Sequence, residues 1–343
     1  MAERVTIFDI AKEAGVSIAT VSRVMAGASN VRPATREKVI DVANKYNFRP
    51  SMLASNLSRK VSRTLGILVP LEDNPYYTEL SLAAQREAQA AGYSAILYQL
   101  PTGGLLNDSF MDLLIARRLD GLLVCGDILS ELNEHSFEAS LQQLRQHMAV
   151  VMITSDRPYE HCVCLCNGLD IATRMSMNHL FQLGHERIAM LGGTGPATNP
   201  RTREYTYFSE MTTRGLEPYP YTSGNSLQEG ELCVLKLWGS LGERQPPTAM
   251  ICFNDLIALG ALKQCKKLGL RVPEEMALIG CDNQFFADYA DPPLTTVDLR
   301  IQETARLAVR TLIGPDELPA FHQVMQPNLV IRESCGAHLP HIP

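Results

Sequence analysis

The 343-residue sequence predicts an α/β protein in which an N-terminal all-α head precedes a two-lobed core built on parallel sheets. Apolar residues recur at helical spacing from Ile7 to Tyr46, with a glycine between the first two helical segments. From Thr64 onward, short apolar runs alternate with longer helical patterns, which is typical of parallel sheets covered by helices on both faces. The alternation comes in two series of similar size, so we expect two lobes with a cleft between them.

Two short helices and the turn between them are predicted at the start of the chain. Thr6 can cap the first helix, and Asp9 places a carboxylate near the positive end of its dipole. Gly15 ends this helix because it accepts a positive φ, and Ser17 caps a second helix over Ile18–Met25. Two helices joined by a Gly-containing turn form a helix-turn-helix, whose second helix can enter the major groove of DNA.

The charge distribution favours nucleic acid as the partner of this head. A third helix begins at Pro33, so the spacing alone also fits a three-helix interaction module. Residues 1–63 carry 11 Lys/Arg and 5 Asp/Glu, whereas the rest of the chain carries 20 and 32. The formal net charge of −6 therefore divides into a basic head and an acidic body, as expected when only the head contacts phosphates.

The composition is that of a soluble globular protein, with 45% hydrophobic and 20% charged residues. The start MAERVTIFDI lacks a basic stretch followed by an apolar run, so no secretory signal is expected. No apolar run approaches membrane-spanning length, and the nine cysteines contain no C-x-x-C pair. We expect a cytoplasmic protein with reduced thiols and no membrane partner.

Signals for metal, nucleotide or catalytic chemistry are weak. Cys162, Cys164 and Cys166 alternate along a predicted strand beside His161, which suits a soft metal, although small buried cysteines are the commoner explanation. The Gly-rich stretch 192–195 lacks the Lys-Ser/Thr of a phosphate-binding loop, and no nucleophile–base arrangement is evident. We expect no cofactor, no metal and no enzymatic activity.

The core is expected to contain two series of alternating strands and helices. Strands are predicted at residues 64–70, 94–98, 121–125, 149–153, 187–191, 249–253 and 276–281. Helices are predicted at residues 80–91, 110–118, 132–147, 169–183, 203–215, 232–241 and 257–268. Ligands of such sheets bind outside the carboxyl ends of the strands, so the cleft is the expected small-molecule site.

The head carries a longer residue pattern, which is Thr6-x-x-Asp9-Ile10-Ala11-x-x-Ala14-Gly15-Val16-Ser17-x-x-Thr20-Val21-Ser22-Arg23-Val24. This pattern resembles the signature of the lactose-repressor/galactose-repressor (LacI/GalR) family of transcriptional regulators. The resemblance implies double-stranded operator DNA as a partner. It places Ile18, Ala19 and Arg23 at the bases, and it assigns phosphate contacts to Thr6, Ser17, Thr20, Ser22 and Asn30. Because Ile18 and Ala19 are apolar, contact with thymine methyl groups or pyrimidine edges is expected there, and Arg23 is the candidate for a guanine contact.

Residues 49–63 resemble the hinge helix of the same family, although a plain linker is the alternative. Ala54 and Leu57 match the family pattern, which implies that Leu57 is an apolar wedge inserted into the minor groove. Ser51 and Ser55 replace the more usual Asn and Arg, so backbone contacts there are less certain. A helix this short is marginal alone, which makes it suitable as a switch.

The resemblance extends through Asn254-Asp255, Ile279-Gly280-x-Asp282-Asn283 and Pro293-Leu294-Thr295-Thr296-Val297. It implies a periplasmic-binding-protein-like core that binds a sugar-like effector between its lobes. The effector-binding residues implied in this way are Tyr76, Tyr77, Asn199, Arg203, Asn254 and Asp282. Core packing of both tyrosines and a helix-capping role for Asp282 are the alternatives. Thr206 stands where Gly is common, and Cys166 stands where Asp is common, so the identity of the ligand does not transfer.

The resulting hypothesis is a homodimeric regulator of the repressor type, whose affinity for operator DNA is controlled by a small-molecule effector. We expect a head over residues 1–48, a hinge over 49–63 and a core over 64–343. Lobe 1 would comprise about 64–166 and 298–328, and lobe 2 about 167–297 and 329–343. The C-terminal residues 337–343 contain two prolines and no leucine heptad, which favours a dimer over a tetramer. A solute-binding protein without a DNA role and an enzyme of sugar metabolism are the alternatives.

Overall fold

The chain divides into two compact units, a head over Met1–Arg63 and a core over Thr64–Pro343. The computed structural model describes residues 5–25, 28, 30–48, 61–101, 108–126, 134–154, 159, 162–193, 200–221, 224–314 and 321–339. The predicted hinge residues Ala54 and Leu57 lie outside the described residues, as does the predicted effector-binding residue Asn199.

The described residues of the head form three helices whose limits agree with the sequence prediction. They are α1 (Ile7–Ala14), α2 (Ile18–Met25) and α3 (Pro33–Lys45). The Asp9 carboxylate accepts hydrogen bonds from the Thr6 N–H at 2.8 Å and from the Thr6 hydroxyl at 2.6 Å, which fixes the start of α1. Gly15 ends α1 with a φ of +65°, and the Ser17 hydroxyl accepts from the Thr20 N–H at 3.2 Å to begin α2.

The apolar faces of these helices meet in one small core. Its buried side chains are Ile10, Ala11, Ala14, Val21, Val24 and Val39. They recur every three or four residues along each helix, so one face of each helix is buried and the opposite face stays exposed.

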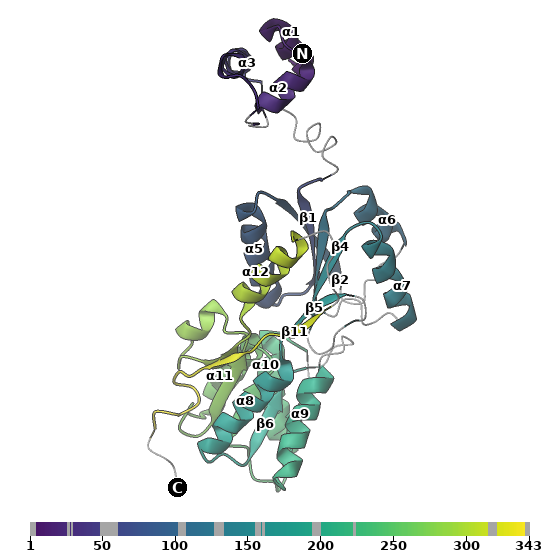
Figure 1. Cartoon of the computed structure of the whole chain (residues 1–343). Helices are drawn as coiled ribbons and strands as arrows, with labels where there is room; N and C mark the ends of the chain where they lie inside the picture. The colour runs from purple at the N-terminus through teal and green to yellow at the C-terminus, as the bar shows by residue number, and fades with distance from the viewer. Residues whose placement is uncertain are drawn as a thin grey trace. The chain divides into compact units, whose positions relative to one another are not determined.

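Lobe 1 of the core is a six-stranded sheet in the order β11-β5-β4-β3-β1-β2, and every adjacent pair is parallel. Its strands are β1 (Thr64–Leu71), β2 (Ser94–Pro101), β3 (Gly121–Cys125), β4 (Ala149–Thr154), β5 (Val163–Cys166) and β11 (His322–Val324). Helices α5 (Pro75–Ala90) and α12 (Ile301–Leu312) cover one face, and α6 (Asp108–Ala116) and α7 (Glu134–Arg145) cover the other (Figure 1).

Lobe 2 is a second six-stranded sheet, in the order β12-β10-β9-β8-β6-β7. Its strands are β6 (Ile188–Leu191), β7 (Tyr219–Tyr221), β8 (Ala249–Cys252), β9 (Ala277–Cys281), β10 (Thr295–Asp298) and β12 (Asn328–Val330). Helices α8 (Leu169–Gln182) and α9 (Pro200–Thr213) pack on one face, and α10 (Leu227–Ser240) and α11 (Asp255–Leu268) pack on the other. A short 3-10 helix, η1 (Phe285–Tyr289), follows β9.

The chain passes between the lobes after β5, after β10 and between β11 and β12, so both lobes contain segments that are distant in sequence. Several details differ from the sequence prediction, among them α10, which begins at Leu227 rather than at residue 232, and β7, which was not predicted. Strand β12 pairs with β10 in the antiparallel direction. Helix α5 begins at Pro75 rather than at Leu80, because the Asn74 side chain accepts a hydrogen bond from the Tyr76 N–H at 3.0 Å and caps it there.

The cysteines are packing residues in this structure. All nine are free and buried. Cys162, Cys164 and Cys166 lie in the same apolar cluster on one face of the lobe 1 sheet, as their alternation predicts. Among the described residues, no three metal-ligating side chains are close enough together to hold an ion. Within the same part of the chain, no helix is long and apolar enough to cross a membrane.

Candidate DNA-reading helix and effector cleft

Helix α2 presents an exposed N-terminal end while its opposite side is buried in the head. The side chains of Ser17, Ile18, Ala19, Ser22 and Arg23 are all exposed. Of the other residues with predicted phosphate contacts, Thr6 and Asn30 are exposed and Thr20 is half-buried against the Ser17 hydroxyl at 2.9 Å. An exposed N-terminal end on a packed helix is the geometry that a recognition helix requires.

Tyr76 and Tyr77 lie in the first turn of α5, in lobe 1. The Tyr76 side chain is buried, and its hydroxyl accepts a hydrogen bond from the Asn167 amide at 2.9 Å. The two rings meet edge to face, with centroids 5.2 Å apart. The Tyr77 hydroxyl lies against Gly126, where an added Cβ would come within 2.8 Å of it. Burial raises the pKa of Tyr76, and the negative charge of Asp282 in lobe 2 adds to this effect.

Arg203, in the first turn of α9, reaches across to the end of β8. Its guanidinium donates a hydrogen bond to the Phe253 carbonyl oxygen and lies 5.1 Å from the centroid of the Phe253 ring. Its positive charge also lowers the pKa of Asp282, opposing the effect of burial. Arg203 and Asp282 therefore occupy one neighbourhood, although they come from α9 and from the end of β9.

Asp282 is a buried carboxyl on strained backbone. Its φ is +105° and that of Asn283 is +51°, a region that side-chain-bearing residues adopt at an energetic cost and mostly at functional sites. Burial raises the pKa of Asp282 well above its usual range, and the like charges of Asp255 and Glu79 raise it further. A carboxyl held in this way can both donate and accept hydrogen bonds, which suits hydroxyl groups of a ligand.

Asn254 caps helix α11. A helix-capping role had been the alternative prediction for Asp282. The Asn254 Oδ1 accepts a hydrogen bond from the Ile257 N–H at 2.8 Å and so caps α11. Its Nδ2 donates to the Asn225 carbonyl oxygen at 3.1 Å. Both ends of this amide therefore have protein partners. The structure brings Tyr76, Arg203 and Asp282 together, whereas Asn254 is committed to the loop beside them.

Asp255 is a site residue that the sequence argument did not select. It is fully buried, and its Oδ1 accepts a hydrogen bond from the Thr296 hydroxyl at 2.6 Å while its Oδ2 accepts from the Gln284 N–H at 2.7 Å. A Cβ at Gly280 would lie 2.2 Å from the Asp255 Oδ1, so this carboxylate needs a glycine there. Burial raises the pKa of Asp255 to about 7. Asp255, Gly280 and Thr296 were present in the resemblance motifs, but their spacing did not reveal that they meet.

Glu79 joins the two lobes beside this network. Its carboxylate accepts from the Gln284 side chain of lobe 2 at 3.2 Å and from the Gln302 side chain of α12 at 3.0 Å. Glu79 and Asp282 both line a cavity of about 530 Å³ that opens beside α12. A change in the angle between the lobes would have to rearrange these hydrogen bonds.

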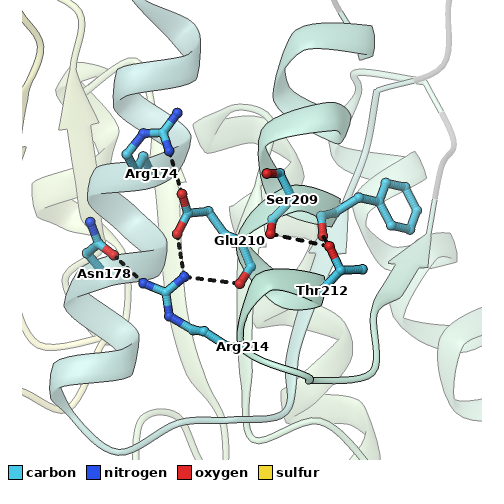
Figure 2. Close-up of polar contacts among 7 residues, drawn as sticks. Arg174, Asn178, Ser209, Glu210, Thr212 and Arg214 are labelled. Atoms are coloured by element: carbon cyan, nitrogen blue, oxygen red, sulfur yellow. Dashed lines mark hydrogen bonds and ion pairs between the residues drawn. The ribbon is translucent and has the colours of Figure 1, made fainter.

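A charged cluster fixes α9, and with it Arg203, onto α8. Figure 2 shows the Glu210 carboxylate between two guanidinium groups, Arg174 of α8 and Arg214 just beyond α9, at 2.5 Å from each. Arg214 also donates to the Glu210 carbonyl oxygen at 3.0 Å and to the Asn178 side chain at 3.2 Å. The Glu210 side chain is largely buried, whereas both arginines remain about half exposed.

Replacing Glu210 by alanine is expected to lower the free energy of unfolding of the core by about 1–3 kcal/mol, because two charge-assisted hydrogen bonds to a buried acceptor are lost. The matched control is Glu217→Ala, which removes an exposed carboxylate paired with Arg244 and should cost at most about 0.5 kcal/mol. Urea unfolding of both variants measures the difference. Equal losses would show that Glu210 is no more than a surface ion pair.

Known bacterial regulatory proteins are similar to this chain in both its head and its core. The LacI family of bacterial regulatory proteins matches residues 6–51, and a periplasmic binding protein-like domain matches residues 177–335. The HTH-type transcriptional repressor CytR of Escherichia coli (strain K12) is 30% identical over 97% of this chain and 96% of its own length. The HTH-type transcriptional regulator DegA of Bacillus subtilis (strain 168) is 29% identical over 96% and 98%. The structure of the lac repressor dimer bound to operator and the anti-inducer ONPF matches with a TM-score of 0.84 and 26% identity, over 97% of this chain and 99% of that one.

The head and core together define a DNA-binding transcription regulator rather than an enzyme, because the relatives over nearly the whole chain are regulators. The chain belongs to the LacI family of bacterial regulatory proteins. The fold predicted from the sequence, a helix-turn-helix head on a two-lobed, periplasmic-binding-protein-like core, is confirmed.

Proposed function

We propose that this protein is a repressor that binds double-stranded operator DNA as a homodimer. A small molecule bound between the lobes would lower or raise its affinity for the operator. The observation that carries the proposal is the exposed N-terminal end of α2 in a chain whose core holds the buried Tyr76 and Asp282 and the half-buried Arg203 in one neighbourhood. The lac repressor relative was solved as a dimer on operator with an anti-inducer, which supports the same arrangement here.

On DNA, each subunit would place α2 in the major groove of one half-site. Arg23 would donate to a guanine edge, while Ile18 and Ala19 would contact thymine methyl groups. Phosphates would be held by the polar residues around the helix, namely Thr6, Ser17, Thr20, Ser22 and Asn30. Ala54 and Leu57 would enter the minor groove between the half-sites when two hinge segments pair.

In the cleft, the effector would be a sugar or a related metabolite. Tyr76 and Tyr77 would supply aromatic surface from lobe 1, while Arg203 and Asp282 would bond its polar groups from lobe 2. Asn199 would complete the site, and Asn254 would support it by capping α11. Because these residues come from both lobes, a bound ligand favours one lobe angle over another. Couplings of this kind are typically about 1–3 kcal/mol, which is a change of about 5- to 150-fold in operator affinity.

The proposed DNA contact is tested with Arg23→Ala. We expect affinity for the selected operator to fall by about 5- to 150-fold and discrimination against scrambled DNA to fall with it, because a bidentate base contact is lost. The operator is first selected by the wild-type protein from a randomised duplex library, and binding is followed by fluorescence anisotropy at several salt concentrations.

The matched control is Lys38→Ala, which removes an exposed positive charge from α3. It should weaken binding to both duplexes by the same small factor and leave discrimination intact. An Arg23→Ala protein that kept full discrimination would contradict the assignment of α2 as the base-reading helix.

A further inference from the structure

A cavity of about 530 Å³ lies beside the start of α12. Both lobes line it, and its polar side chains include Glu79, Asp282, Asp298, Arg300, Gln302 and Arg306. Tyr76, Tyr77 and Arg203 of the effector cleft do not line it. The volume falls within the range of about 300–1,000 Å³ that is usual for small-molecule sites, so the cavity is large enough for a ligand of its own.

The N-terminus of α12 borders this cavity and favours negative charge. Arg300 precedes the helix with a φ of +58°, and its side chain does not cap it. Within the described residues, the N–H groups of residues 301–303 have no hydrogen-bond acceptor. Unpaired N–H groups and the helix dipole together attract an anion. Arg306 adds positive charge to the same lining, since its guanidinium uses Nε for Glu87 and keeps its two amino groups.

The cavity also carries two carboxyl groups that form no ion pair with a described residue. Glu79 accepts hydrogen bonds from the side chains of Gln284 at 3.2 Å and Gln302 at 3.0 Å, which are both neutral amides. Asp282 is 5% exposed, and within the described residues its side chain receives a hydrogen bond only from the Cys281 thiol, a weak donor. Buried polar groups nearly always have a partner, so Asp282 points to a ligand group that completes its hydrogen bonding.

Groups of both signs therefore line one cavity, and they select the charge of its ligand. A ligand that is only anionic would be repelled by the Glu79 and Asp298 carboxylates. A ligand that is only cationic would be repelled by Arg306 and by the positive end of α12. A zwitterion places one charge against each set of groups, and a free α-amino acid is a small zwitterion of this kind.

We propose that this cavity is a second ligand site of the protein and that it binds a free α-amino acid. The ligand carboxylate accepts hydrogen bonds from the N–H groups at the start of α12 and from Arg306. The ligand ammonium group donates to Glu79 and Asp282. The inference goes beyond the proposed function, which assigns one effector site and a sugar or related metabolite to it. Because the ligand contacts both lobes, its binding favours one angle between them.

The first test titrates the full-length protein with each of the common L-amino acids by calorimetry. The amino acid that binds is then compared with its carboxamide, which lacks the negative charge, and with its N-acetyl derivative, which lacks the positive charge. We expect each derivative to bind about 10- to 100-fold more weakly, because charge-assisted hydrogen bonds are lost. A protein that binds no amino acid with a Kd below about 1 mM, or that binds a derivative as tightly as the parent, would overturn the proposal.

The second test locates the ligand carboxylate with Arg306→Ala. This variant should bind the amino acid about 10- to 100-fold more weakly and bind the carboxamide as the wild type does, because the lost contact is one to the carboxylate. Arg306→Lys keeps a positive charge and should recover part of the affinity. Arg310→Ala is the matched control, since it removes an exposed arginine one turn further along α12 that does not line the cavity. Wild-type affinity in Arg306→Ala, or an equal loss in Arg310→Ala, would place the ligand elsewhere and overturn the proposal.

Glu79→Gln tests the ammonium end of the ligand. It keeps the shape of the side chain and removes its charge, so it should weaken binding of the amino acid and leave the affinity for the N-acetyl derivative unchanged. An equal loss for both probes would mean that Glu79 acts on the shape of the cavity, and the assigned orientation of the ligand would be wrong.

Operator binding separates this inference from the proposed function. If a sugar changes operator affinity while no amino acid binds, this inference is wrong and the proposed function stands. If an amino acid binds through Arg306 in a protein that does not bind a selected operator, this inference is supported and the proposed function is wrong.

Discussion

An Ile10→Ala variant is expected to lose most of its operator binding at physiological temperature, because its head will be largely unfolded while its core is intact. Ile10 is fully buried in a head core of six buried side chains. Removing such a side chain costs about 2–5 kcal/mol through lost burial and the cavity that remains. A unit of this length has a total stability of only about 3–9 kcal/mol, so one substitution removes much of it.

Scanning calorimetry of the full chain separates the two units, and operator binding by anisotropy reports the consequence. Ile40→Ala is the matched control, since the same atoms are removed from an exposed side chain on α3. It should leave the head transition almost unchanged. If both variants melted alike, the helix packing described for the head would be incorrect.

The head could be predicted almost residue by residue because its signals are local. Thr6 and Asp9 meet within one turn, Gly15 needs no distant partner to adopt its positive φ, and Ser17 contacts Thr20 three residues later. The same holds for the strands that have continuous apolar runs, whereas the short strands β7, β10 and β11 were not predicted. Helix α5 was predicted to begin too late because the cap at Asn74 lies outside its apolar periodicity.

The interlobe site could be predicted only as a set of residue types. Tyr76, Arg203 and Asp282 were named through a resemblance, and the structure places them together. Asn254 caps a helix, whereas Asp255 holds a buried network of hydrogen bonds. This difference depends on partners that lie 29 and 41 residues away in the sequence. Asn167 meets Tyr76 across 91 residues, and no local pattern contains that contact. Polar contacts between residues so distant in sequence depend on how the strands and helices pack, and no local sequence pattern shows that packing.

The core is expected to become less stable as the pH rises from about 4 to about 7, and Asp255 contributes to this loss together with the buried carboxyl of Asp282. Burial raises the pKa of the Asp255 carboxyl to about 7, from 3.8 in an exposed chain. In that window the folded state binds a proton that the unfolded state has released, so each step upward in pH favours unfolding. For Asp255 the full difference amounts to about 4 kcal/mol, of which about 2 kcal/mol falls between pH 5.5 and pH 8.

The measurement is urea unfolding at pH 5.5 and pH 8 without small molecules. The fluorescence of Trp238, the single tryptophan, monitors the unfolding of lobe 2. His179 and His185 act in the opposite direction, because burial lowers the pKa of each. The test is therefore the difference between wild type and Asp255→Asn, in which both histidines are unchanged. The variant should gain about 2 kcal/mol relative to wild type on going from pH 5.5 to pH 8. Asp291→Asn is the control, because it changes an exposed carboxylate and should follow the wild type at both pH values. If the stability of Asp255→Asn changed with pH as that of the wild type does, Asp255 would be ionised throughout this range.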